Sequence, residues 1–154
     1  MHQLFPSPTA TAEPVDIERD FAQWIDEQAE LLRIRDFERL DLIHLVEELE
    51  AMSSRLKREL GSRLEVLILH LLKCQFQPTR KSSSWTHSIV EQRSRIIDLL
   101  DQNPSLNTHF DEYSHKHYRV AVIRAAHATG LGVNAFPKEL PFTRDELLDK
   151  HFAP

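Results

Sequence analysis

A histidine inside the most apolar stretch of the chain is the first residue whose type and position suggest chemistry. His70 directly follows the apolar run Val66 to Leu69, in a segment that we expect to be buried. A buried imidazole needs hydrogen-bond partners. Glu47 and Glu48 on the preceding predicted helix, or Glu91 on the following one, could supply them if these helices pack as antiparallel neighbours.

Two interpretations of this polar cluster stay open. Its members are Glu47, Glu48, His70, Glu91 and Arg93. They form either a small metal or acid–base centre between helices, or a structural network that fixes helix packing. Structural polar networks in protein interiors shift the pKa values of their members just as active sites do, so a buried polar cluster is not by itself a sign of catalysis. We therefore favour the structural role.

Metal ligands occur in this sequence only as incomplete sets. A di-iron centre in a helical bundle uses two Glu-x-x-His turns, and Glu112 to His115 is the one such turn here. His70 and Cys74 share a helix face, but a tetrahedral zinc site takes four ligands. The histidines between positions 109 and 127 are six, two and ten residues apart, so no three share a face. We expect no metal and no cofactor.

A second candidate site lies in the loop before Trp85. Arg80, Lys81 and Ser84 stand at the start of a predicted helix, where free amide groups attract anions. Serines in this position are more often helix caps, so we favour a packing role. Arg80 with His87 also fits the loose pattern of a class of helical ribonucleases, with His87 as general acid or base, but this spacing is common by chance.

Composition places these residues in a helical protein. The chain has 154 residues, of which 41% are hydrophobic, and it holds three glycines and one cysteine. A single cysteine excludes an internal disulfide and a cysteine-rich zinc module and indicates a reducing compartment. No apolar run approaches the ~18 residues of a membrane span. We therefore expect a cytoplasmic protein that does not cross a membrane.

Charge is spread unevenly along the chain. Residues 13–50 carry thirteen acids and four bases, whereas residues 54–95 carry nine bases and three acids. We expect acidic helices to lie beside basic ones. The alternative, a basic face for nucleic acid at 54–95, is disfavoured by an isoelectric point near 6.0.

Hydrophobic periodicity predicts an all-α bundle of five helices and a short C-terminal one. We expect an unstructured tail over residues 1–14 and a single helical domain over residues 15–154. The predicted helices cover residues 16–34, 41–52, 53–76, 84–103, 105–130 and 143–152. The helix at 53–76 is apolar on all sides, so we place it at the centre of the bundle. Gly61 marks a point where another helix approaches closely.

Three strings of the sequence together resemble a known family: FAQWIDEQAELLRIRDFERLD, LIHLVEELEAMSSRLKREL and LEVLILHLLKCQFQPTRKSSSWTHSIVEQRSRI. They are similar to the bacterial family known as domain of unknown function number twenty-nine. The resemblance continues through FPKELPFTRDELLDKHF and covers residue 17 to the C-terminus. It implies a compact helical domain with no established activity, substrate or cofactor. Residues typical of the family include Glu47, Glu48, His70, Trp85, Glu91 and Arg93.

The sequence offers no nucleophile triad and no phosphate-binding loop. We therefore expect a non-enzymatic helical domain that acts through a protein partner or through its own oligomer. One alternative is a small enzyme, including a ribonuclease, that uses the Glu/His cluster. Another is a nucleic-acid-binding module that uses residues 54–95.

Overall fold

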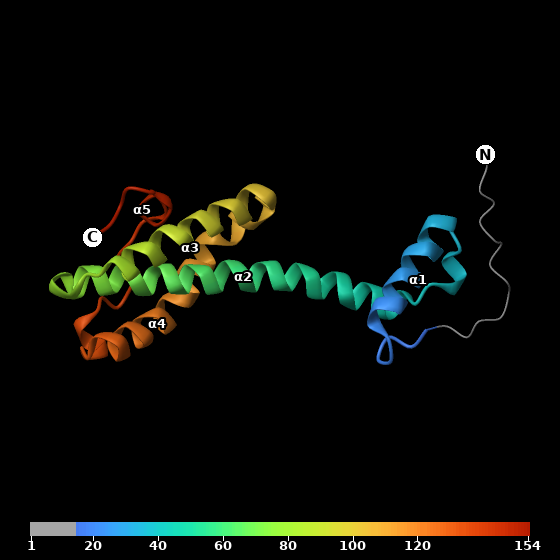
Figure 1. The fold of residues 1–154 in the computed structure, drawn as a ribbon, viewed down its shortest axis with the longest axis horizontal. Helices are drawn as coiled ribbons and strands as arrows, with labels where there is room; N and C mark the ends of the chain where they lie inside the picture. Colours follow the sequence, from blue (N-terminus) through green and yellow to red (C-terminus); the bar gives the residue numbers. More distant parts are fainter. Residues whose placement is uncertain (1–14) are drawn as a thin grey trace. The chain divides into compact units, whose positions relative to one another are not determined.

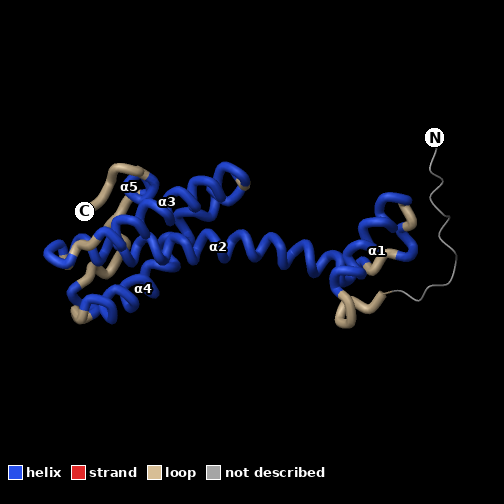
Figure 2. Tube along the Cα trace, viewed as in Figure 1, coloured by secondary structure: helices blue, strands red, loops and turns tan. Residues whose placement is uncertain are grey.

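All regular elements of the described part of the chain, residues 15–154 of the computed structural model, are helices (Figure 1, Figure 2). The all-α class predicted from the sequence is thereby confirmed. The tail expected at residues 1–14 lies outside the described residues.

Five α-helices follow one another along the chain. They are α1 (Phe21–Ile34), α2 (Leu42–Phe76), α3 (Ser83–Gln102), α4 (Phe110–Thr129) and the short α5 (Arg144–Leu148). Short 3-10 helices stand between them at Phe37–Arg39, Pro78–Arg80, Pro104–His109 and Val133–Ala135. Contacts divide the chain into a first unit that ends at Met52 and a second unit, Ser53–Pro154. The expectation of one domain over residues 15–154 stays a prediction.

One helix boundary predicted from the sequence is wrong. The helices expected at 41–52 and 53–76 are the single helix α2, and Ser53 and Ser54 lie within it. Serine is favoured at helix caps, yet it is also accommodated inside a helix when the residues beside it favour helical structure. Here those neighbours are Met52 and Arg55.

The first unit is held together at the junction of α1 and α2. The buried side chains of α1 are Trp24, Gln28 and Leu31. Trp24 Nε1 donates to a carboxylate oxygen of Asp41 at 3.3 Å, and Gln28 Oε1 accepts from the Asp41 amide at 2.8 Å. The same carboxylate accepts a hydrogen bond from the amide of His44 at 3.4 Å, so Asp41 caps the start of α2.

The second unit contains one continuous apolar core around the later part of α2. Leu60, Leu64, Leu67, Ile68 and Leu71 are fully buried there. Residues of α3, α4 and α5 complete the same cluster, and α3 and α4 flank α2 in Figure 1. The buried, central position predicted for residues 53–76 is confirmed for this stretch.

Two helix ends in the second unit show regular capping chemistry. Gly130 ends α4 at φ 74°, in the left-handed region that glycine adopts without strain. Thr143 caps α5, and its side chain and that of Glu146 form a reciprocal capping box. Helices α3 and α4 start at Ser83 and Phe110, rather than at the serines expected to begin them.

None of the described helices combines the length and the apolarity that crossing a membrane requires.

Candidate functional site

The five residues of the predicted polar cluster fall in two units. Glu47 and Glu48 belong to the first unit, and His70, Glu91 and Arg93 belong to the second. Within the described second unit, no hydrogen bond or ion pair joins His70, Glu91 and Arg93 to each other, and Glu91 is exposed. A common role for the five residues stays a prediction.

Arg93 has a clear structural partner. Its guanidinium is 2% exposed and donates from Nε to the Leu147 carbonyl at 2.9 Å and from Nη2 to the Glu146 carbonyl at 2.8 Å. A third hydrogen bond runs from Nη1 to the carbonyl of Phe152. These acceptors are backbone carbonyl groups at the end of α5 and just beyond it. The last carbonyl groups of a helix have no hydrogen-bond partner within the helix. Arg93 therefore anchors the C-terminal segment to α3.

His70 lies half-buried on α2 without the expected carboxylate partner. Its Nδ1 is buried and has no hydrogen-bond partner in the described part of the chain. Burial, together with the positive charges of Lys73 and Arg124, lowers the pKa of His70 to about 4. The imidazole is consequently neutral at pH 7 and carries an unsatisfied, buried nitrogen.

Sequence analysis missed a polar cluster around Glu65, between α2 and α4. The Glu65 carboxylate accepts hydrogen bonds from Arg124 Nη1 at 2.6 Å and from His117 Nδ1 at 3.2 Å. Burial raises the pKa of Glu65, but the hydrogen bonds from Arg124 and His117 outweigh it and hold the pKa below its usual value. The ring of Tyr113 stacks on His117 with 6.0 Å between centroids.

A signal for this cluster exists in the sequence. Gly61 and Glu65 stand one helical turn apart on α2, and the structure places His117 against both. A glycine inside a helix, followed one turn later by a charged residue in a mostly apolar run, marks a close helix crossing with a polar contact beside it. The close approach predicted at Gly61 is confirmed, and its partner is His117.

The predicted anion loop lies at the surface. Arg80, Lys81 and Ser84 are all exposed. Lys81 Nζ donates to the carbonyl of Pro154 at 3.1 Å, and the Ser84 hydroxyl lies 2.9 Å from that of Ser82. Nearby, Lys73 Nζ lies 4.2 Å from the ring centroid of Trp85, which ties the start of α3 to α2. These contacts are compatible with the packing role that the sequence favours.

Among residues 15–154, no group of three or more His, Cys, Asp or Glu side chains is placed to hold a metal ion. Cys74 is buried, and burial raises the pKa of its thiol.

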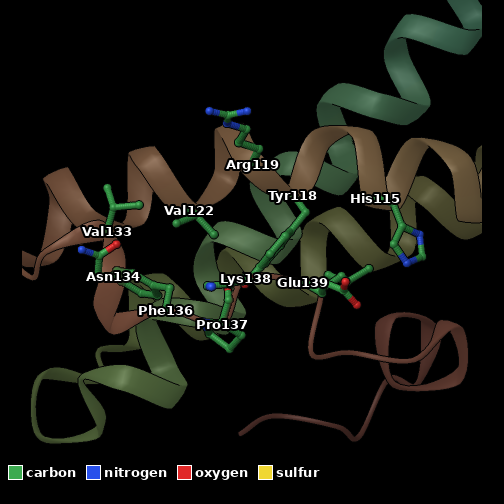
Figure 3. A pocket seen from close by; sticks show the side chains of 11 residues that line it. His115, Tyr118, Arg119, Val122, Val133, Asn134, Phe136, Pro137, Lys138 and Glu139 are labelled. Carbon is green, nitrogen blue, oxygen red and sulfur yellow. The ribbon is translucent and has the colours of Figure 1, made fainter.

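A cavity of about 740 Å³ lies between α4 and the segment 133–140 (Figure 3). Its walls are formed from α4 by His115, Tyr118, Arg119 and Val122, and from the segment by Val133, Asn134, Phe136, Pro137, Lys138, Glu139 and Leu140. Tyr118 donates its hydroxyl to the Pro137 carbonyl at 2.7 Å and so fixes the segment to the helix. In Figure 3 the guanidinium of Arg119 points away from the other lining side chains. The cavity is therefore mainly apolar.

The first unit exposes an unusual number of large apolar side chains. Of the fourteen such side chains exposed among the described residues, ten lie between positions 21 and 52. They are Phe21, Ile25, Leu32, Ile34, Phe37, Leu42, Ile43, Val46, Leu49 and Met52. Residues 15–52 also hold twelve acids and four bases. Concentrated apolar exposure of this kind is typical of a surface that binds another molecule.

Comparison with known proteins identifies a family and nothing more specific. Residues 17–153 match the family described as Domain of unknown function DUF29. No curated protein and no solved structure matches the chain.

Proposed function

We propose that the chain, which belongs to this family of unknown function, is an interaction module whose first unit binds a protein partner. The observation that carries the proposal is the exposure of ten large apolar side chains on the first unit. The apolar face defined by α1 and the start of α2 is the contact surface.

The spacing of the exposed residues supports a helix-sized contact. On α2, Leu42, Val46 and Leu49 recur at intervals of four and three and therefore share one face. On α1, Phe21, Ile25 and Leu32 lie four and seven positions apart and also share one face. Stripes of this spacing are how a helix presents an apolar face to a groove or to another helix.

The degree of exposure gives the proposal its energetic basis. Ile43 is 73% exposed and Leu49 is 59% exposed. Fully burying one such side chain contributes about 1.5–3 kcal/mol, so covering several offsets the entropy lost on association. A cytoplasmic location is part of the proposal, and the free thiol of Cys74 is compatible with it.

Two exposed positions test the proposal. The substitutions I43S and L49S together remove two large apolar contacts without disturbing a buried residue. A matched control is V90S with V133S, because these valines are 55% and 51% exposed in the second unit. Circular dichroism checks that all three proteins fold.

Native mass spectrometry of untagged protein from its own cells is the measurement. The wild type and the control are expected in a complex heavier than the 18.0 kDa chain, and the I43S/L49S protein as the bare chain. A wild type that stays a bare chain at every concentration, or an I43S/L49S protein that keeps the complex, would contradict the proposal.

A further inference from the structure

We infer that the partner of the apolar first unit is α4 of a second copy of this chain. The inference rests on the proposed function and specifies its partner. The evidence is an exposed stripe on α4 whose charge is opposite to that of the first unit.

The stripe on α4 is amphipathic and faces solvent. Lys116, Val120, Ile123 and His127 follow one another at intervals of four, three and four, so they share one helix face. All four are exposed, and Val120 and Ile123 are 44% and 53% exposed. Two of the four large apolar side chains that the second unit exposes therefore lie on this one face.

The surroundings of the stripe are basic. Between positions 113 and 138 the chain contains four bases and no acid. Arg124 pairs with Glu65, whereas neither Lys116 nor Arg119 has a carboxylate partner within residues 15–154. The stripe thus combines apolar contact area with two cations available to an acidic surface.

Charge decides between the possible pairings of two copies. With twelve acids against four bases in residues 15–52, one first unit repels another. The same acids attract the cations beside Val120 and Ile123. Pairing the first unit with α4 therefore joins apolar side chains to apolar side chains and acidic side chains to basic ones. A pairing of two first units would not join opposite charges.

This contact joins two different surfaces, so it is heterologous. When each copy offers its first unit to the α4 stripe of the other, two such contacts close a symmetric dimer. The predicted species in solution is a dimer of twice 18.0 kDa.

A charge-swap experiment on the full chain tests the pairing. The variant E47K/E50K reverses two exposed acids of α2, and K116E/R119E reverses two exposed bases of α4. Each variant alone places like charges opposite each other at the reversed positions of both contacts and should weaken dimerisation by about tenfold or more. Mixed together, the two variants restore opposite charges at both contacts, so a heterodimer should form with nearly wild-type affinity.

Sedimentation equilibrium across a range of concentrations measures the dimer constants, and native mass spectrometry counts the heterodimer. The matched control is R80E/R95E, which reverses two exposed bases elsewhere in the second unit and should dimerise like the wild type. A wild type that stays monomeric, or variants whose mixture forms no heterodimer, would overturn the inference.

The proposed function and this inference can fail separately. If the chain is monomeric alone but I43S/L49S still abolishes a complex with another protein, the partner is not a second copy and the proposed function stands. If wild-type monomer binds vesicles of anionic lipid and K116E/R119E does not, α4 serves a lipid surface and the inference is overturned.

Discussion

The imidazole of His117 lies directly against the backbone of Gly61. A methyl group at position 61 would come within 2.8 Å of Cδ2 and 2.9 Å of Cε1 of that ring. The ring is held on its other side by the hydrogen bond from Nδ1 to Glu65. Helices α2 and α4 can therefore approach closely at this point only because one of them has no side chain there.

The first prediction concerns the substitution G61A. Alanine favours helix over glycine by about 1 kcal/mol, but here its methyl group must displace the His117 ring and break the contact with Glu65. We expect a net loss of about 1–3 kcal/mol in the free energy of unfolding, measured by urea denaturation.

A second background separates the two effects of G61A. In H117A the space beside Gly61 is open, so adding G61A should stabilise the protein by up to about 1 kcal/mol. If G61A were destabilising by the same amount in both backgrounds, the contact with His117 would not be the cause.

The second prediction is that H70L stabilises the protein, and more so in acid. Leucine removes the unpartnered Nδ1 of His70, a change that should add about 1 kcal/mol or more to the free energy of unfolding. The folded pKa is about 4, below the usual 6.5, so between these values the unfolded chain binds a proton that the folded protein does not. Wild-type stability therefore falls as the pH drops from 6.5 towards 4.

Urea denaturation at about pH 7.5 and about pH 5 checks this dependence on proton binding. The advantage of H70L should be larger at the lower pH. His87 is exposed, so H87L is the control and should show no such increase. An H70L protein that is less stable than the wild type at both pH values would show that the imidazole has a partner in solution.

The third prediction is that R93K releases the C-terminal segment. A lysine ammonium cannot reproduce the planar set of donors that reaches three carbonyls, so we expect a loss of about 2–4 kcal/mol. Amide hydrogen exchange over residues 144–152 should accelerate, while R95K, at an exposed position of the same helix, should leave it unchanged. Unchanged exchange in R93K would refute the anchoring role.

The fourth prediction concerns the junction of α1 and α2. The hydrogen bond that His44 Nδ1 donates to the Asp41 carboxylate, at 2.6 Å, raises the pKa of His44 above 6.5. In D41N the side chain can still cap α2, but the negative charge is gone, so the pKa of His44 should fall towards 6.5. An NMR titration of the imidazole protons measures it.

The sign of the accompanying stability change follows from the raised pKa. The ion pair makes its full contribution to the free energy of unfolding below pH 6.5. This contribution is lost as the pH rises through the folded pKa of His44. The penalty of D41N should therefore be larger in mild acid than in mild alkali. E47Q removes only a weaker charge effect and should lower the pKa of His44 less.

Much of the fold could be predicted from the sequence because local signals were strong. The apolar spacing that predicted helices at 16–34, 84–103 and 105–130 agrees with α1, α3 and α4 of the structure. The break expected at Ser53 does not exist, because a cap preference is weak against the helix-forming residues on either side.

The candidate site was less predictable, because helix order alone does not determine which side chains meet. Arg93 was placed in the predicted polar cluster, but its acceptors are backbone carbonyls near the end of α5, which no side-chain pattern reveals. His117 was considered only as one of the histidines that cannot form a metal site, although it contacts Glu65 from 52 positions away in the sequence. Long-range contacts of this kind depend on helix packing.

The two tryptophans give the chain a built-in optical reporter in each unit. Trp24 is buried in the first unit, with its indole nitrogen bonded to Asp41, and Trp85 is half-buried in the second beneath the ammonium of Lys73. With one tryptophan replaced by phenylalanine, the fluorescence of the other follows the melting of its own unit alone. Two such single-emitter proteins would reveal whether residues 15–52 lose their structure at a lower denaturant concentration than residues 53–154.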